Sequence, residues 1–322
     1  MRIVIPEDYQ RAVGGLECFA RLHEHEVVLL DRPLADLDAA AAAFADAEVL
    51  VLIRERTRID ADLLARLPKL RLISQTGRLS SNVDIDACTR HGVAVAEGSG
   101  SPVAPAELTW ALVMAASRRL RDYGDALHSG HWQAIGDARL GRVLHGRTLG
   151  IWSYGKIGRL VAGYGRAFGM RVQVWGSEAS MAQARADGFE PFASREALFE
   201  GSDVLSLHRR LGDGSRHDVT EADLLRMRPD ALFVNTSRAE LVAPGALLAA
   251  LDASRPGMAA IDVFESEPVL DPADPWLRHP RVLAAPHLGY VERDSYEAYF
   301  GAAFDNVLAF AAGQPTNIVG YR

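Results

Sequence analysis

Residues 150–158 read GIWSYGKIG and lie between two apolar runs. RTLGIW (147–152) precedes the turn, KIGRLVAGYGRAF (156–168) has the spacing of a helix, and MRVQVWG (170–176) follows as a second apolar run. This order predicts a strand, a glycine-rich turn, a helix and a parallel strand. In such a βαβ unit, a turn of the pattern Gly-x-Gly-x-x-Gly is typical of dinucleotide binding.

The turn departs from that pattern at one position. Gly155 and Gly158 supply the second and third glycines, which let the backbone approach a pyrophosphate and let the helix pack closely on the strand. Ser153 replaces the first glycine, and a serine can tolerate a tight turn by bonding its own backbone. We expect the pyrophosphate to bind at the helix N-terminus. A purely structural strand-to-helix turn is the alternative. The predicted binding residues are Ser153, Gly155, Lys156, Ile157 and Gly158.

The residues that follow the second strand bear on the choice of cofactor. An acid that bonds the adenosine ribose is expected about 20 residues past the loop. Glu178 falls near that distance, whereas Gly176 and Ser177 occupy the strand tip itself. A carboxylate there favours NAD, although Arg209 and its neighbour on a later loop could accept the 2′-phosphate of NADP. Alternatively, Glu178 only caps the next helix.

Short apolar runs alternate with helical patterns along the first hundred residues. Runs at 2–7, 26–31, 49–55, 71–77 and 92–98 are separated by helical patterns, the first of them at 9–23. Continuous apolar strands are what a parallel sheet covered by helices on both faces requires. We therefore predict a doubly wound domain in this part of the chain.

A long helical pattern near 105–130 leads into a second α/β rhythm. The last helical pattern, 295–313, is expected to return to the first domain. The predicted domains are 1–101 with 291–322, and 102–290.

The composition of the chain indicates which kinds of molecule the protein binds. The chain has 322 residues, 48% of them hydrophobic, and a formal net charge of −7, which argues against a nucleic-acid surface. No apolar run approaches the ~20 residues of a membrane span, and the N-terminus lacks a signal-type apolar segment. The two cysteines, Cys18 and Cys88, are expected to be reduced. We expect a cytoplasmic protein that binds small molecules, without a metal site, since HEHE (23–26) lacks a histidine pair at helical spacing.

Three further stretches carry a family resemblance. VNTSRAELV (234–242), AAIDVFESEP (259–268) and LAAPHLGY (283–290), together with the turn and the closing GQPTNIV (313–319), resemble the D-isomer-specific 2-hydroxyacid dehydrogenases. That family includes D-3-phosphoglycerate dehydrogenase and the glyoxylate and hydroxypyruvate reductases. The resemblance implies two doubly wound parallel-sheet α/β domains: a Rossmann-type nucleotide domain and a flavodoxin-like substrate domain. It also implies hydride transfer between NAD(P) and a small D-2-hydroxy or 2-keto acid.

The resemblance assigns a catalytic trio of Arg238, Glu267 and His287. A histidine suits proton transfer in both directions because its ordinary pKa lies near neutrality. Glu267 would orient the imidazole and stabilise its charged form, and the planar fork of Arg238 would bind the substrate carboxylate or polarise its carbonyl. Taken singly, Arg238 could form a surface ion pair, Glu267 could be a solvated loop acid, and His287 could be a core histidine.

Further cofactor contacts and a partner are implied by the same resemblance. Asp262 would hold the nicotinamide carboxamide, Thr236 would line the cofactor pocket, and His208 would lie near the pyrophosphate. An Asp at a strand end can equally be a cap or turn residue. A homodimer built on the long helices is expected, although the apolar stripe around Trp110 could also be intramolecular core.

The substrate loop departs from the family. The family pattern resembles GVGxDNID, and this chain has TGRLSSNVD (76–84), so Gly77 matches while Arg78 and Leu79 replace Val and Gly. A guanidinium at position 78 suggests a substrate with a second acid group, dicarboxylic or phosphorylated, unless it points to solvent. Arg54 is a weaker candidate for binding the same acid group, because the neighbouring charges Glu55 and Arg56 indicate an ordinary solvated charge run.

Two other functions fit the same fold. A dinucleotide-sensing binding protein would need the turn at 153 but no acid–base pair. A formate or phosphite dehydrogenase would have similar architecture, but a Glu–His pair suits proton transfer from a hydroxyl better.

Overall fold

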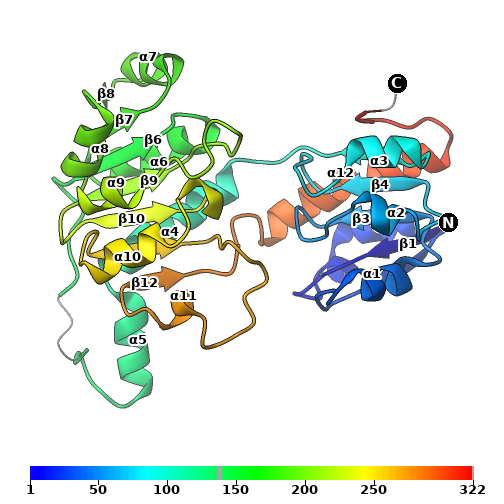
Figure 1. The fold of residues 1–322 in the computed structure, drawn as a ribbon, viewed down its shortest axis with the longest axis horizontal. Coiled ribbons are helices and arrows are strands. Elements are labelled where there is room, and N and C mark those ends of the chain that lie inside the picture. The colour runs from blue at the N-terminus through cyan, green and yellow to red at the C-terminus, as the bar shows by residue number, and fades with distance from the viewer. Residues whose placement is uncertain (136–139, 321–322) are drawn as a thin grey trace. The chain divides into compact units, whose positions relative to one another are not determined.

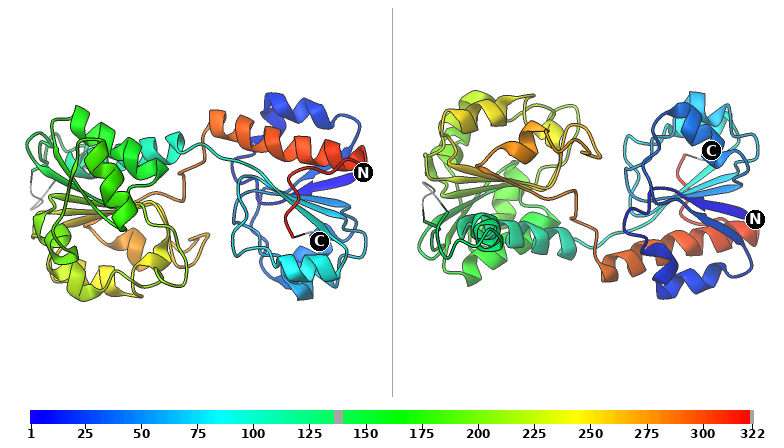
Figure 2. Two further views of the ribbon diagram at one scale, coloured as in Figure 1. Left: turned by 90° about the horizontal axis from the view of Figure 1, so that it is seen from above. Right: turned by 90° about the horizontal axis from the view of Figure 1, so that it is seen from below.

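The computed structural model describes residues 1–135 and 140–320, and the chain divides into two compact units. Unit 1 comprises Met1–Ser101 and Val291–Arg322, and unit 2 comprises Pro102–Tyr290 (Figure 1). Each unit contains one parallel sheet with helices on both of its faces, as Figure 2 shows. The predicted fold class, two doubly wound α/β domains, is confirmed.

Five parallel strands form the sheet of unit 1 in the order β2-β1-β3-β4-β5. This is the flavodoxin-like order, in which the first strand lies inside the second. β3 and β4 are buried along their whole length, because helices cover both faces of the sheet. The strands are β1 (Arg2–Ile5), β2 (Glu26–Leu29), β3 (Val49–Leu52), β4 (Leu72–Gln75) and β5 (Ala94–Glu97).

Three short helices of unit 1 begin at an aspartate. The side chains of Asp36, Asp60 and Asp84 each accept a hydrogen bond from a backbone N–H in the first turn, which satisfies a donor that the helix leaves free. The helices they cap are α1 (Leu37–Phe44), α2 (Ala61–Leu64) and α3 (Ile85–Arg90).

The last helix, α12 (Arg293–Ala311), belongs to unit 1 and packs on β4. Ser74 of β4 donates to the carbonyl of Ala303 at 3.0 Å. At its N-terminal end the Glu297 carboxylate accepts the amide of Cys18 at 3.0 Å, which ties the end of the chain to its beginning.

The helix expected at 9–23 is wrong in type. The structure has two short 3-10 helices there, η1 (Val13–Gly15) and η2 (Glu17–Leu22). Gly14 and Gly15 lie side by side in the middle of the segment, and paired glycines disfavour a continuous α-helix because each loses more backbone freedom than other residues.

Seven parallel strands form the sheet of unit 2 in the order β12-β11-β10-β9-β6-β7-β8. The first strand, β6, is central. The chain runs outward through β7 and β8, then returns to build β9 to β12 on the other side, which is the Rossmann order. Ligands in such sheets bind beyond the carboxyl ends of the strands, where the order reverses. The strands are β6 (Thr148–Trp152), β7 (Arg171–Trp175), β8 (Glu190–Pro191), β9 (Val204–Leu207), β10 (Leu232–Asn235), β11 (Met258–Ile261) and β12 (Val282–Ala284).

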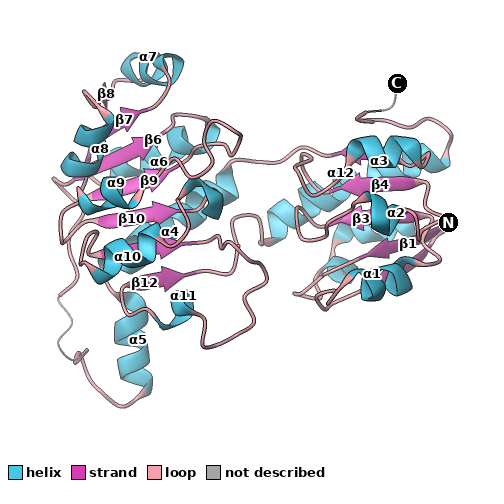
Figure 3. Ribbon diagram, in the orientation of Figure 1, coloured by secondary structure: helices cyan, strands magenta, loops and turns pink. Residues whose placement is uncertain are grey.

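Helices cover both faces of this sheet and bury two apolar clusters (Figure 3). One cluster forms beneath α4 and α6 and the other beneath α8 to α10. The helices are α4 (Val103–Ser117), α5 (Leu120–His128), α6 (Lys156–Ala167), α7 (Glu178–Ala186), α8 (Arg195–Gly201), α9 (Glu221–Leu225), η3 (Ala239–Leu241), α10 (Ala246–Asp252) and α11 (Pro275–Arg278).

The single long helix expected at 105–130 is two helices. α4 ends at Ser117 and α5 begins at Leu120, because Arg119 adopts a left-handed backbone with φ of +54°. The Arg119 guanidinium then pairs with Asp122 at 2.7 Å in the first turn of α5. A left-handed residue ends one helix and redirects the chain, and no glycine marks the break in the sequence.

Both cysteines are free and buried, as expected. Burial raises the pKa of the Cys18 thiol to about 12 and that of Cys88 to about 11, so neither is an activated nucleophile. Among the described helices, none combines the length and the apolar character that crossing a membrane requires.

Candidate active site

The turn between β6 and α6 lies at the switch in strand order. Ser153, the first residue after β6, adopts φ of +77°, the left-handed region that favours glycine. Its N–H donates to the carbonyl of Trp175 at 2.7 Å. The Ser153 hydroxyl makes no hydrogen bond to any described residue, so the expectation that this side chain bonds its own backbone is wrong. The sheet instead holds the residue in place through its main chain.

The two glycines of the turn differ in their surroundings. A Cβ at Gly158 would overlap the Ser153 carbonyl oxygen, so only glycine lets α6 approach this closely. A Cβ at Gly155 would meet nothing within 4 Å. Gly155 is the N-cap of α6, and no side chain caps this end of the helix. An uncapped helix N-terminus behind open space fits the pyrophosphate of a dinucleotide. Lys156 and Ile157 form the first turn of the same helix.

The tip of β7 presents a glycine, a serine and an acid. A Cβ at Gly176 would contact Ser153 Cα at 3.4 Å, so the strand tip lies against the turn. Ser177 is the N-cap of α7 and accepts the Ser180 amide at 3.3 Å. The alternative in which Glu178 caps the helix is therefore wrong. The exposed Glu178 carboxylate pairs with Arg185 of the same helix at 3.3 Å.

The residues after β9 also adjoin the turn. The N–H of His208 donates to the carbonyl of Trp152 at 2.9 Å, and a Cβ at Gly158 would lie 3.5 Å from the His208 Cβ. Burial lowers the pKa of His208 to about 4, so the imidazole is neutral at physiological pH. Arg209 is already engaged: its guanidinium pairs with Asp218 and donates to the Gly214 carbonyl at 3.0 Å.

The turn after β10 holds Arg238. Asn235 donates to the Arg238 carbonyl at 2.9 Å and accepts the Ser237 amide at 3.1 Å, which closes the turn. Arg238 is half-buried, and its Nη1 donates to the carbonyl of Ser237 at 2.6 Å. Thr236 faces α4, where its hydroxyl lies 2.7 Å from that of Thr109.

The loops after β11 and β12 bring Glu267 and His287 together. His287 Nδ1 lies 2.6 Å from Glu267 Oε2, and the other carboxylate oxygen accepts the Phe264 amide at 2.9 Å. Burial opposes ionisation of Glu267, but the hydrogen bond and charge of His287, the Phe264 amide and the charge of Arg238 together hold its pKa below the ordinary value. The carboxylate is therefore ionised at neutral pH and can only accept, so Nδ1 carries the proton.

The second ring nitrogen of His287 remains available to a substrate. Nε2 of His287 makes no hydrogen bond to any described residue, and the His287 side chain is 24% exposed. The residue itself has φ of +51°. A histidine oriented through one nitrogen and open at the other is the arrangement that acid–base catalysis requires.

Asp262, directly after β11, is 1% exposed. Its Oδ1 accepts the amide of Leu288 at 2.7 Å and its Oδ2 that of Gly289 at 3.0 Å. Burial raises the pKa of Asp262 to about 6, although these amides and the charge of His287 oppose the rise. The sequence predicted a cofactor ligand here and missed the contact with the His287 loop, because amides far along the chain leave no residue pattern.

The substrate loop of unit 1 lies at the carboxyl ends of β3 and β4. Gly77 has φ of +79°, and a Cβ there would overlap the Arg54 guanidinium. Arg54 Nη1 donates to the carbonyl of Thr76 at 3.2 Å. Arg78 is exposed, and the Leu79 amide donates to a carboxylate oxygen of Glu97 at 3.1 Å.

The charge run at 54–56 is not simply solvated. The side chains of Arg54 and Glu55 are only 21% and 23% exposed. Arg56 lies over the Tyr9 ring at 4.7 Å and donates to the Glu7 carbonyl at 2.6 Å. The sequence missed this cluster because the partners of Arg56 come from the segment after β1 and, through Tyr296, from α12, both far from the run itself.

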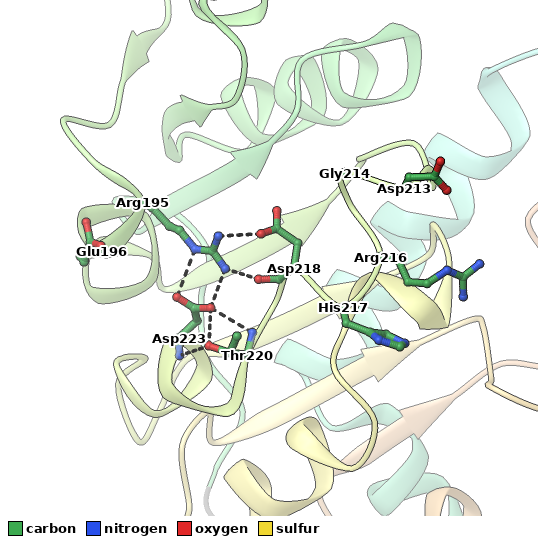
Figure 4. A pocket seen from close by; sticks show the side chains of 9 residues that line it. All are labelled: Arg195, Glu196, Asp213, Gly214, Arg216, His217, Asp218, Thr220 and Asp223. Atoms are coloured by element: carbon green, nitrogen blue, oxygen red, sulfur yellow. Dashed lines mark hydrogen bonds and ion pairs between the residues drawn. The ribbon is translucent and has the colours of Figure 1, made fainter.

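A separate surface pocket of about 490 Å³ in unit 2 contains none of the predicted site residues (Figure 4). Its central cation, Arg195, binds Asp218 at 2.8 Å and both carboxylate oxygens of Asp223, at 3.1 and 2.6 Å. These ion pairs join α8 to α9 and to the segment before it, so we regard the pocket as structural.

Comparisons with known proteins agree on one family. Residues 110–289 match the family model described as "D-isomer specific 2-hydroxyacid dehydrogenase, NAD binding domain". A glyoxylate reductase of Aeropyrum pernix is 38% identical over 269 residues, which cover 81% of this chain and 80% of the relative.

Two solved structures agree over nearly the whole chain. A phosphoglycerate oxidoreductase of Vibrio cholerae has a TM-score of 0.95 at 53% identity, covering 97% of this chain and 99% of that one. A proposed D-3-phosphoglycerate dehydrogenase oxidoreductase of Ralstonia solanacearum has a TM-score of 0.97 at 55% identity, covering 99% and 96%.

Proposed function

Because the chain belongs to the D-isomer specific 2-hydroxyacid dehydrogenase family and is an NAD-dependent oxidoreductase, we propose that His287, Glu267 and Arg238 carry out its chemistry. The observation that supports this most is the 2.6 Å contact between His287 Nδ1 and Glu267 Oε2, at the carboxyl end of the unit 2 sheet. A protein that only sensed a dinucleotide would have no use for this pair. When bound, the nicotinamide of NAD exchanges a hydride with C2 of the acid.

His287 is the acid–base catalyst. In the reducing direction Nε2–H donates its proton to the oxygen of the 2-keto group, and in the oxidising direction Nε2 takes the proton of the 2-hydroxyl. Glu267 accepts a hydrogen bond from Nδ1–H throughout, which fixes the ring orientation and stabilises the imidazolium that forms during oxidation.

Arg238 binds the substrate carboxylate. Its guanidinium offers a planar fork of donors that matches a carboxylate, and a donor directed at the 2-keto oxygen would polarise that bond. The influence of its charge on the Glu267 carboxylate is consistent with a position beside the acid–base pair.

Unit 2 is the proposed dinucleotide-binding domain and unit 1 the proposed substrate domain. The uncapped α6 N-terminus would hold the pyrophosphate, with neutral His208 beside it. Ser177 and Glu178 would meet the adenosine ribose, because a hydroxyl and a carboxylate follow the tip of β7 and Arg209 is engaged by Asp218. Thr236 and Asp262 would line the nicotinamide end.

The proposed substrate is a small D-2-hydroxy or 2-keto acid with a second acidic group. Unit 1 supports this with two guanidinium groups, the exposed Arg78 and the partly buried Arg54, which flank Gly77. The Leu79 amide is already bonded to Glu97, so we assign the loop's role in binding to Gly77 and Arg78.

We further propose a homodimer in the cytoplasm. α5 buries no side chain within its own unit, and Leu120 and Leu127 on it are 58% and 56% exposed. Trp132, just beyond this helix, is 77% exposed. A second copy that covers these side chains would remove them from water. Two free buried thiols are consistent with a reducing compartment.

The test of this function compares His287→Asn with the wild type in the reduction of 2-keto acids by NADH. We expect turnover to fall by at least about 100-fold while the Kd for NADH stays within about twofold. His217→Asn, at an exposed histidine of the same unit, is the matched control and should retain turnover. Wild-type turnover in His287→Asn would refute the assignment of the acid–base catalyst.

A further inference from the structure

We propose that Asp262 is a positioning residue, which holds His287 in reach of Glu267 by binding the backbone of the two residues that follow the histidine. This inference rests on the proposed function, since it concerns the same acid–base pair. It gives Asp262 a role within the protein, in addition to any contact with a cofactor.

Asp262 stands between neighbouring strand ends. Its N–H donates to the carbonyl of Asn235 at 3.0 Å, which fixes its main chain to the end of β10. Its side chain reaches in the opposite direction, to the loop after β12, where it accepts the amides of Leu288 and Gly289. Ala285, at the start of that loop, donates to the Ile261 carbonyl at 2.8 Å. Asp262 therefore connects β10 and β11 to the segment that carries the catalytic histidine.

The acid–base pair needs such a connection because both partners lie on loops. Glu267 is five residues beyond Asp262 on the loop after β11, and His287 lies past the end of β12. His287 has φ of +51°, a conformation that a non-glycine residue keeps only when its surroundings impose it. The two amides held by Asp262 belong to the residues directly after it, so they fix the direction in which the chain leaves His287.

The site requires a carboxylate. The backbone amides of Leu288 and Gly289 are both N–H donors, and Asp262 offers one acceptor oxygen to each of them. An asparagine offers one acceptor, and its NH₂ would face the remaining N–H, which leaves a buried donor unpaired. The loop lies against the carboxylate, because a Cβ at Gly289 would be in van der Waals contact with Asp262 Oδ2 at 3.4 Å.

The test compares Asp262→Asn and Asp262→Glu with the wild type before cofactor is added. Asp262→Asn removes one acceptor, and Asp262→Glu keeps the charge but moves both oxygens by one methylene. The readout is the downfield proton NMR signal of the His287 Nδ1–H bonded to Glu267, identified by its loss in His287→Asn. Glu265→Gln, at an exposed carboxylate on the same loop, is the matched control. Thermal unfolding checks that each variant is folded. If either Asp262→Asn or Asp262→Glu fails to fold, the NMR signal of the other variant tests the inference.

We expect the signal to be lost or displaced in both variants and unchanged in Glu265→Gln. We also expect kcat, measured at saturating NADH, to fall by about 10- to 100-fold with an altered pH profile, beyond any change in the Kd for NADH. An unchanged NMR signal, with the loss confined to NADH affinity, would overturn the inference and make Asp262 a cofactor ligand only. Because the signal is read without turnover, it is independent of whether His287 proves to be the catalyst.

Discussion

Three glycines of one βα unit should respond differently to the same added methyl group. Gly155, Gly158 and Gly163 all lie in or at the start of α6. A Cβ at Gly158 would overlap the Ser153 carbonyl oxygen, whereas a Cβ at Gly155 or Gly163 would meet nothing within 4 Å. Replacing each by alanine therefore separates the packing role of a glycine from its role in leaving room for a ligand.

The expected magnitudes follow from these surroundings. Gly163→Ala should raise the free energy of unfolding by about 0.5 to 1 kcal/mol, because alanine loses less backbone freedom in a helix. Gly158→Ala should lower it by about 1 to 3 kcal/mol, because the backbone must shift to relieve the overlap. Gly155→Ala, at a helix N-cap with extended backbone, should change it by less than about 1 kcal/mol.

Binding should follow a different order. Gly155→Ala places its methyl group in the open space where the pyrophosphate is proposed to lie, so the Kd for NADH should rise by at least about tenfold, or about 1.4 kcal/mol. Gly163→Ala should bind NADH like the wild type. Urea unfolding followed by tryptophan fluorescence gives the stabilities, and titration of NADH fluorescence gives the affinities.

Two results would refute the reasoning. If Gly155→Ala bound NADH as tightly as the wild type, the α6 N-terminus would not be the pyrophosphate site. If Gly158→Ala were as stable as Gly163→Ala, the close approach of α6 to the turn would not limit packing at this position.

Four other outcomes are expected. Glu267→Gln should lower kcat by at least about 100-fold with little change in the Kd for NADH, and turnover within a few-fold of the wild type would contradict the orienting role. Arg78→Ala should reduce kcat/KM for dicarboxylic keto acids more than for glyoxylate, and an unchanged preference would remove Arg78 from the substrate site. The pKa of Asp262 is raised by burial from 3.8 to about 6, so the folded protein holds this proton more tightly than the unfolded chain. The stability that this group contributes is therefore complete below about pH 4 and is lost as the pH rises through 6. Over that window the free energy of unfolding of the wild type, measured in urea relative to that of Asp262→Asn, should fall by about 3 kcal/mol. A difference between the two proteins that does not change with pH would contradict this prediction. Leu127→Asp should shift the mass measured by light scattering from dimer to monomer, and an unchanged mass would exclude α5 from the interface.

The strands were the most predictable part of the fold. Parallel strands covered on both faces are continuous apolar runs, so the runs at 49–55 and 71–77 contain β3 and β4. The two wrong helix predictions, at 9–23 and 105–130, have local causes that the spacing of apolar residues does not reveal. A left-handed Arg119 divides one expected helix, and the Gly14–Gly15 pair prevents another.

The candidate site was predictable where a residue acts through its own chemistry. The motifs identified Glu267 and His287, and the structure brings these two side chains together. They did not reveal the contact of Asp262 with the Leu288 and Gly289 amides, because any residue type can supply a backbone N–H. They also did not reveal the partners of Arg56, since Tyr9 and Tyr296 reach it only through the tertiary fold.

The most direct test of the central claim is the reaction itself. Purified protein with NADH should consume the reduced nicotinamide when given glyoxylate, hydroxypyruvate, 2-ketoglutarate or oxaloacetate, and chiral chromatography of the products formed from the last three identifies their configuration. We predict turnover of at least one of these acids, with a product of D configuration at C2 whenever that carbon is chiral. Tight binding of NADH without reduction of any of these acids, or a product of L configuration, would contradict the account.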